Sequence, residues 1–380
     1  MDTLDKLQAL SSQMYLEPAE DAGCPQIPAA SSITGMVHDA VLPGGKRVKL
    51  LKTLLTSACE RNCYYCPFRA GRNYRRSTLR PEEMASTFMN LHRAGLVEGL
   101  FLSSGIVAGG VRTQDKLIDT AEILRRKYDY RGYLHLKIMP GAERHQVERT
   151  MQLADRVSVN LEAPNTARLL KLAPRKEFTE ELLQPLRWVQ EIRTHEFRDK
   201  GWNGRWPSSV TQFVAGGAGE SDVELLSTTE YLYSQLGLRR TYFSAFSPVP
   251  DTPLENQAPT PAQREHRLYQ SSYLLRDYGF TLEDLPFGAD GNLPMNVDPK
   301  VAWAQAHLTQ NPVELNRASR QELLRIPGFG PKSVNAILNA RRHTPLKDMA
   351  DLRRLGITPS RATPFILLNG RRPAHQPSLF

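Results

Sequence analysis

Between residues 46 and 278, short apolar runs alternate with longer segments whose apolar positions recur every three or four residues. The short runs indicate strands, and the longer segments indicate amphipathic helices. The expected strands are 48–55, 99–103, 133–139, 157–161, 210–215 and 241–246, and the expected helices are 81–91, 114–128, 143–154, 179–197, 222–236 and 261–278. This alternation predicts an α/β fold with a parallel sheet, whose ligand sites gather at the carboxyl ends of the strands.

The flanking segments suggest further divisions of the chain. Residues 1–45 contain a short amphipathic segment followed by Pro, Gly and Ser, which predicts a lead-in or cap. Residues 46–286 form the main domain, and 287–310 form a linker because 287–299 is rich in Gly, Pro, Asp and Asn. A small helical domain is expected over 311–370. The prolines in 371–380 favour an extended tail.

Composition narrows the class of protein. No apolar run approaches the length that spans a bilayer, and the first residues lack the pattern of a secretory signal. Four cysteines in 380 residues do not form a disulfide framework, so reduced thiols and a cytoplasmic location are expected. The net charge is +9, and residues 311–380 hold twelve Lys or Arg against four acids. Such a local field favours a polyanion such as nucleic acid, although a solvated basic surface is the alternative.

The candidate chemistry centres on Cys59-Glu-Arg-Asn-Cys63-Tyr-Tyr-Cys66, a C-x3-C-x2-C run that comes after the first expected strand of the main domain. Three thiolates can hold three irons of a 4Fe–4S cluster and leave the fourth iron open to a small molecule. A structural zinc site is one alternative, but it takes four ligands, and the remaining Cys24 lies far upstream. The other alternative to a cluster is that the three cysteines are ordinary buried thiols. Four arginines between 69 and 76 either steer phosphate or form plain surface charge.

The three-cysteine run resembles the signature of the radical S-adenosylmethionine (SAM) enzymes. That resemblance implies a partial (β/α)6 TIM-like barrel, SAM bound to the open iron, and a 5′-deoxyadenosyl radical that abstracts hydrogen from a substrate. It also implies contacts to SAM from strand ends and from the residue before the third cysteine. The implied contacts are Tyr65, Ser103, Ser104, Gly105, Asn160, Glu162, Gly216, Gly217, Phe246 and Ser247. The acid that often comes after the second strand in that family is missing here, so only the backbone role carries over to 103–105. Two strand residues, His135 and Lys137, either point into the barrel, where Lys137 would face the SAM carboxylate or the substrate, or have a structural or solvent-facing role.

The segment Ile326-Pro327-Gly328-Phe329-Gly330-Pro331-Lys332 matches the turn of a helix-hairpin-helix. Glycines in such a turn leave backbone N–H groups uncovered at a helix N-terminus, where a phosphate oxygen can bind. We therefore expect Gly328, Gly330 and Lys332 to contact DNA without reading its sequence. Residues 351–361 resemble a degenerate second copy. A protein-binding helical hairpin is the alternative.

As a whole, the chain resembles the DNA modification or repair radical SAM proteins, a bacterial family often linked to a uracil-DNA-glycosylase-like partner. The resemblance implies DNA as substrate and a flavodoxin or ferredoxin as reductant. An RNA-modifying enzyme and a non-catalytic iron–sulfur DNA-binding or redox-sensing protein are the alternatives. The last residues resemble a bacterial sliding-clamp-binding peptide, in which Gln376, Leu379 and Phe380 would make the contacts. A terminus that docks on its own domain is the alternative.

Overall fold

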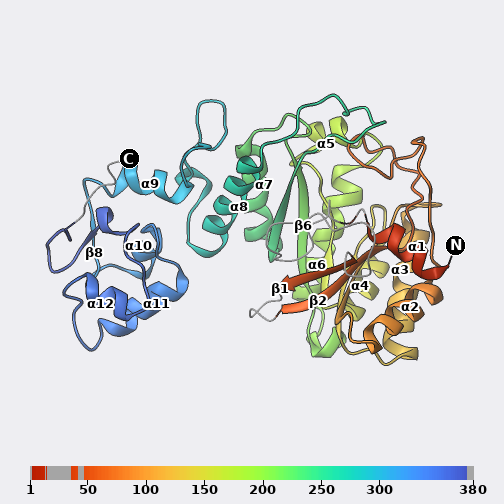
Figure 1. Cartoon of the computed structure of the whole chain (residues 1–380), viewed down its shortest axis with the longest axis horizontal. Coiled ribbons are helices and arrows are strands. Elements are labelled where there is room, and N and C mark those ends of the chain that lie inside the picture. Colours follow the sequence, from red (N-terminus) through yellow and green to blue (C-terminus); the bar gives the residue numbers. More distant parts are fainter. Residues whose placement is uncertain (1, 13, 15–35, 42–46, 375–380) are drawn as a thin grey trace. The chain divides into compact units, whose positions relative to one another are not determined.

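The computed structural model of the chain describes residues 2–12, 14, 36–41 and 47–374 (Figure 1). Cys24 and the predicted clamp-binding residues 376–380 lie outside the described part. The chain divides into two compact units. The first, here called the sheet unit, comprises Met1–Glu220 and Tyr231–Thr260, and the second, the C-terminal unit, comprises Ser221–Glu230 and Pro261–Phe380.

The sheet unit is built on a seven-stranded sheet whose strands keep the order of the sequence. The strands are β1 (Val37–Val41), β2 (Arg47–Leu54), β3 (Gly99–Ser103), β4 (Tyr133–Lys137), β5 (Arg156–Ser158), β6 (Ser208–Ala215) and β7 (Arg240–Ala245). Neighbouring strands from β2 to β7 are all parallel, while β1 pairs antiparallel with β2. The six predicted strands and the α/β partial barrel are confirmed. Strand β1 was not predicted, because His38 and Asp39 leave it without a continuous apolar run.

Helices connect the parallel strands. They are α2 (Pro81–Arg93), α3 (Gly110–Glu122), α4 (Arg144–Leu153), α5 (Thr166–Leu172), α6 (Gln184–His195) and α7 (Asp222–Leu236), and α1 (Thr3–Ser11) precedes the sheet. In α2, Pro81 occupies the first turn, Glu83 bonds back to the N-cap, and the buried Met84, Phe88 and Leu91 face the core. Helices α2, α3, α4 and α6 pack in succession against one another. Helix α5 was not predicted, since seven residues give less than two full turns of pattern.

Two expected helices contain stretches of π-helix. The segment Ile123–Lys127 continues α3, and Phe178–Leu183 leads into α6. The expected helices over 114–128 and 179–197 are therefore continuous along the chain but change their hydrogen-bonding pattern within it. The second π-helical stretch carries Glu181, whose carboxylate bonds Arg61.

The strands alternate between two buried faces, as β4 illustrates. Leu134 and Leu136 are fully buried, and α3 packs on this strand. His135 and Lys137 point to the opposite face because successive side chains alternate along a strand. The His135 ring packs edge-on against Phe101 of β3, with ring centroids 4.6 Å apart. Lys137 lines a cavity at the carboxyl end of the sheet. The two residues therefore have different surroundings, with His135 packed deep in the sheet and Lys137 at the cavity.

The C-terminal unit is mainly helical, as predicted. Its helices are α8 (Ala262–Asp277), α9 (Pro299–His307), α10 (Arg320–Arg325), α11 (Pro331–Ala340) and α12 (Met349–Arg354), and the two-residue strands β8 (Val313–Glu314) and β9 (Ile366–Leu367) pair in parallel. One apolar core contains residues from most of this unit: Ala304, Leu308, Leu315, Leu323, Ile326, Phe329, Val334, Ile337, Leu352 and Phe365.

The compact units divide the chain differently from the domain boundaries expected from sequence. Helix α8 belongs to the C-terminal unit, although its residues were expected in the main domain. Helix α9 lies in the expected linker over 287–310, yet its Ala304 is fully buried in the core of the C-terminal unit. The sequence did not reveal this, because α9 has only nine residues and begins at Pro299, the last residue of the Gly- and Pro-rich stretch.

Candidate cluster and cofactor site

The three cysteines lie in a loop between β2 and α2 whose two ends are joined. Leu79 N donates to Leu55 O at 2.9 Å, and Ser57 N donates to Ser77 O at 3.0 Å. The hydroxyls of Thr56 and Thr78 lie 2.6 Å apart. These contacts pair the strand-like ends of residues 55–79, here called the cysteine loop. The loop therefore starts at the carboxyl end of β2 with a fixed base.

The three sulfurs line one cavity. Cys63 is buried, while Cys59 and Cys66 are partly exposed, and all three thiols are free. Ile106 N, just beyond β3, donates to Cys59 Sγ at 3.5 Å. Burial raises the pKa of the Cys63 and Cys66 thiols above the usual value. Metal binding therefore has to displace a proton from each of these two sulfurs.

The residues between the cysteines attach the loop to its neighbours. The Glu60 carboxylate accepts from Ala108 N at 3.0 Å and Gly109 N at 3.1 Å. Tyr64 N donates to Leu172 O at 2.7 Å. The Arg61 guanidinium bonds Arg175 O and the Glu181 carboxylate. The loop is thus held from the β3 side and from the segment that comes after α5.

Gly105 allows the turn after β3 to approach the cysteine loop closely. Its N–H donates to Thr56 O at 2.7 Å. A Cβ atom at this position would lie 2.1 Å from Ala58 O and 2.9 Å from Ala58 C, which no side chain can tolerate. Glycine is therefore required at position 105 on steric grounds, whether or not a cofactor is bound.

Most of the residues expected at the cofactor gather with the cysteines around the same cavity. Those that line it are Tyr65, Ser103, Ser104, Gly105, Asn160, Glu162, Phe246 and Ser247. Gly216 and Gly217 are not among its lining residues. The structure thus brings the ends of β2, β3, β5 and β7 together at one site, as expected for the carboxyl edge of a parallel sheet.

A buried ion pair lies in the wall of the cavity. Lys176 Nζ lies 3.0 Å from Glu162 Oε1, and both side chains are less than a tenth exposed. Burial alone would raise the pKa of Glu162, but Lys176, Lys137 and a hydrogen bond from Tyr65 hold that pKa below its usual value. Burial likewise opposes the charge of Lys176, but Cys63 and Glu162 outweigh it and raise the pKa of Lys176. Both partners are therefore charged.

Glu162 adopts an unusual backbone conformation, with φ of +65°. This left-handed region is uncommon for residues other than glycine. The backbone is fixed on both sides, because Glu162 N donates to Gln212 O and Val214 N donates to Glu162 O. The strain is thereby compensated, and the carboxylate is directed to the cavity where Lys176 meets it.

Sequence reasoning missed several lining residues. Lys176 lies after α5 in an irregular segment with no motif, and Gln212 lies in the middle of β6. Asn160 Nδ2 donates to Gln212 Oε1 at 3.4 Å, so the two amides act together at the cavity wall. For Gln212 one signal existed: an amide side chain within 210–215, a stretch whose other residues are mostly apolar. Lys176 had none, since only the folded chain brings it to Glu162.

The donor set fits a cluster with three protein ligands. Three cysteine sulfurs and one backbone N–H that bonds a sulfur face a common cavity, and thiolates are the usual ligands of such clusters. Among the residues that the structure describes, no group of three or more His, Cys, Asp or Glu is placed to hold a single metal ion. Also within the described part, no helix has the length and apolar character needed to cross a membrane.

Residues 53–232 match the family model of the Radical SAM superfamily. This region of the chain is therefore a radical SAM domain. The matched region contains the cysteine loop and strands β3 to β6. That family implies a 4Fe–4S cluster with SAM as its partner cofactor, and Cys59, Cys63 and Cys66 are the residues that would hold the cluster.

Solved structures were also compared. The FeFe-hydrogenase maturase HydG from Carboxydothermus hydrogenoformans is 15% identical over 60% of this chain and 51% of its own, with a TM-score of 0.47. Methylornithine synthase (PylB) is 16% identical over 61% of this chain and 63% of its own, also with a TM-score of 0.47. The chain therefore spans about half to two thirds of the length of these proteins. No curated protein matches the chain.

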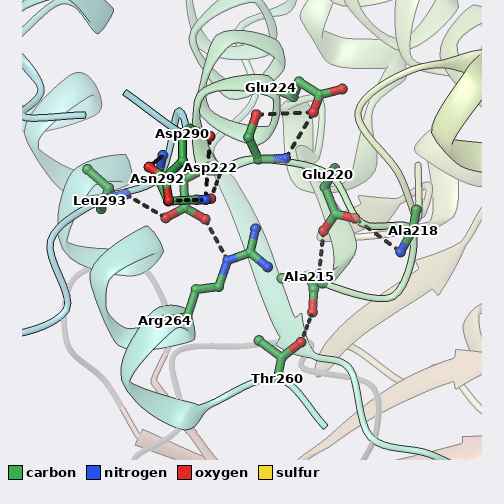
Figure 2. A network of polar contacts seen from close by, with 12 residues as sticks. Ala215, Ala218, Glu220, Asp222, Glu224, Thr260, Arg264, Asp290, Asn292 and Leu293 are labelled. Atoms are coloured by element: carbon green, nitrogen blue, oxygen red, sulfur yellow. Dashed lines mark hydrogen bonds and ion pairs between the residues drawn. The ribbon is translucent and has the colours of Figure 1, made fainter. Parts of the chain in front are cut away.

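In this radical SAM domain the Gly-rich turn after β6 supports the cavity wall from behind. The Glu220 carboxylate accepts hydrogen bonds from Gly216 N and, at 3.1 Å, from Ala218 N (Figure 2). A Cβ atom on Gly217 would lie 2.8 Å from a Leu172 methyl carbon and 3.0 Å from the Phe246 ring. The glycine thus lets Phe246 pack closely and reach the cavity.

The predicted hairpin turn lies between two short helices of the C-terminal unit, α10 and α11. Ser319 caps α10, and Gly330 is the N-cap of α11, whose first residue is Pro331. Gly328 has φ of +84°, which the turn requires and which glycine adopts without strain. The second segment differs: α12 ends before Gly356, and the next helical turn, Thr363–Phe365, is a 3-10 helix instead of an α-helix.

Proposed function

We propose that this protein is a radical SAM enzyme that acts on DNA in modification or repair. The observation that supports the first part most is the convergence of Cys59, Cys63 and Cys66 on one cavity at the carboxyl ends of the strands. When bound, the reduced cluster and SAM together supply a 5′-deoxyadenosyl radical, which abstracts hydrogen from a substrate.

The residues of this chain have definite tasks in that chemistry. Cys59, Cys63 and Cys66 would hold the cluster through their sulfurs, with SAM at the iron that has no protein ligand. The backbone at 103–105 offers polar groups at the cavity wall, and Gly105 keeps that turn against the cysteine loop. Apolar side chains of Leu54, Ile106, Met139 and Phe246 line much of the remaining wall. They limit the water that reaches the reacting centre.

The positive charge near the C-terminal end of the chain supports DNA as the substrate class. Residues 311–380 carry a large excess of Lys and Arg. The hairpin turn presents Gly328, Gly330 and the exposed Lys332 at the N-terminus of α11. Backbone N–H groups and a cation at such a terminus suit a phosphate oxygen. A base inside a duplex would have to be flipped out or met in a single strand.

The decisive experiment for the radical SAM activity measures 5′-deoxyadenosine. Anaerobically reconstituted protein is reduced with dithionite and given SAM, with and without DNA or RNA. We expect 5′-deoxyadenosine from the native protein and a higher yield with DNA than with RNA. A higher yield with RNA would favour the RNA-modifying alternative. Absence of 5′-deoxyadenosine from protein with a full cluster would favour a non-catalytic iron–sulfur protein.

Replacement of the ligands gives the first specific prediction. Cys59→Ala, Cys63→Ala or Cys66→Ala should each abolish the visible absorbance of the cluster and SAM cleavage, because a remaining pair of thiolates cannot hold three irons. Cys24→Ala should leave both unchanged. A full cluster in Cys63→Ala would falsify the ligand assignment.

Three partners belong to the proposal. The first is the electron donor that the cluster needs, for which we propose a flavodoxin or ferredoxin. The second is a uracil-DNA-glycosylase-like protein, as a separate partner. A sliding clamp is the third, through Gln376, Leu379 and Phe380, and would raise the local concentration of the enzyme on DNA. A fluorescence titration of the clamp with a peptide of residues 373–380 tests the third proposal. We expect binding that is lost when both Leu379 and Phe380 are replaced by Ala; equal binding by that variant would refute it.

A further inference from the structure

One arginine of the cysteine loop binds backbone carbonyls on both sides of the cysteines. Arg76 Nη1 donates to Ser57 O and to Phe68 O, each at 2.7 Å. Arg76 Nη2 donates to Arg69 O at 2.8 Å and to Arg72 O at 3.4 Å. One guanidinium thus bonds four carbonyls. Neither phosphate steering nor plain surface charge, the two uses expected for these arginines, describes this arrangement.

The positions of these carbonyls in the chain show which segments Arg76 connects. Ser57 lies two residues before Cys59, and Phe68 lies two residues after Cys66. The guanidinium therefore joins the entry and the exit of the segment that carries all three cluster ligands. Hydrogen bonds from a charged donor are stronger than those between neutral groups. The carbonyls would otherwise have to find other partners in a partly buried loop.

The arrangement of the four carbonyl acceptors suits an arginine side chain better than a lysine side chain. A guanidinium is planar and presents five donors in a fixed fork, whereas a lysine ammonium is a point charge on a flexible stem. The guanidinium carbon also lies 5.5 Å from the centre of the Tyr74 ring. Within the described part of the chain, the neighbouring Arg72 makes two such bonds, to Pro67 O at 2.9 Å and to Pro250 O at 3.0 Å. Arg75 is exposed.

We propose that Arg76 is a positioning residue that brings the three cysteines to the spacing of the cluster before the cluster binds. The hydrogen bonds of Arg76 join groups of the chain itself, so they can close the loop before iron arrives. Ordering a loop costs conformational entropy, and a preformed loop does not lose that entropy again when the cluster binds. This inference rests on the cluster assignment but not on the identity of the substrate.

The test compares Arg76→Met and Arg76→Lys with Arg75→Met, a control that removes the same charge one residue away. Each variant is reconstituted anaerobically with iron and sulfide. Three quantities are measured: iron per chain, the rate of iron loss to a chelator, and the thermal unfolding temperature of the apo protein. None of them requires turnover.

We expect Arg76→Met to lose iron about tenfold faster than the native protein, with less iron per chain, while the apo unfolding temperature stays within a few degrees of native. Arg76→Lys should lie between the two, because an ammonium replaces only part of the fork. Arg75→Met should behave as native protein does.

Two results would overturn the proposal. Native iron content and native chelator resistance in Arg76→Met would show that the cysteines need no such closure. An apo unfolding temperature that falls by ten degrees or more in Arg76→Met would show a general structural role instead. Cys63→Ala, run in parallel, separates this failure from failure of the cluster assignment, since only the latter predicts native iron content in that variant.

Discussion

At the residue scale, the Glu162–Lys176 pair shows how the site combines charge with burial. Two opposite charges have been removed from water, and each is compensated by the other across 3.0 Å. Removal of Lys176 leaves the buried charge of Glu162 with only Lys137 and Tyr65 to compensate it, which is more costly than removal of both partners. The pair is therefore best tested by a double-mutant cycle, which compares the two single variants with the double variant.

We predict that Lys176→Met lowers the free energy of unfolding by about 3 kcal/mol, and that Glu162→Gln in the same chain restores most of this loss. The measurement is chemical denaturation of the apo protein for the two single variants and the double variant. Simple additivity of the two single effects would show that the pair does not act as a unit.

Gly105 supplies a second prediction at this scale. Gly105→Ala should cost about 3 kcal/mol of stability and reduce the iron bound per chain, because a Cβ atom would overlap Ala58 O. The matched control is Gly95→Ala, where φ is +72° but nothing lies within 4 Å of the added carbon. There only the backbone strain of about 1 kcal/mol should appear, with native iron content. Equal effects of the two substitutions would contradict the steric argument.

At the element scale, Lys300 connects helix α9 with the hairpin turn of the C-terminal unit. Its Nζ donates to Phe329 O at 2.6 Å and lies 4.4 Å from the centre of the Tyr278 ring. Burial lowers the pKa of Lys300 to about 7, with Asp298 opposing and Arg361 reinforcing the change. A neutral amine can still donate this hydrogen bond, so the contact survives deprotonation.

The lowered pKa gives a pH dependence with a definite sign. Between pH 7 and about 10.5 the unfolded chain holds a proton on Lys300 that the folded chain has released. Stability therefore rises with pH in this window, by at most about 1.4 kcal/mol per pH unit. We predict that Lys300→Met removes this rise. Unfolding measured at pH 7.5 and 9 on both proteins checks it, and parallel curves would contradict the shift.

At the same scale, Asp222 joins three segments of the C-terminal unit. Its carboxylate accepts from Arg264 Nε at 2.7 Å and from Leu293 N at 2.9 Å, and its own N–H donates to Asn292 Oδ1 at 3.1 Å (Figure 2). The start of α7 and the loop at 292–293 are thereby fixed to α8. Asn292 is one of the polar residues of 287–299 that suggested a linker, and it takes part in this structural contact.

At the scale of the whole molecule, the core of the C-terminal unit determines which experiments are meaningful. A truncation after residue 311 would remove Leu315, Leu323 and Phe329, which belong to the same apolar core as Ala304. Loss of DNA binding in such a fragment could result from exposed apolar surface alone. Single charge reversals on the surface test the DNA proposal more sharply.

We predict that Lys332→Glu weakens DNA binding about tenfold and lowers the salt dependence of the binding constant by about one phosphate contact. Lys171→Glu makes the same change of charge on an exposed residue of the sheet unit and should have little effect. The measurement is a fluorescence anisotropy titration at several salt concentrations. Equal losses in both variants would indicate that net charge, not the hairpin, governs binding.

The sequence by itself determined the parallel strands, most of the helices and the cysteine ligands. These features depend on local periods of two and 3.6 residues and on a motif of eight consecutive residues, all visible without the fold. Only the tertiary structure decided that Lys176 meets Glu162, that Arg76 closes the cysteine loop and that α9 belongs to the C-terminal core. Those contacts join residues whose separation along the chain obeys no pattern, because they arise from the closure of loops and the packing of elements.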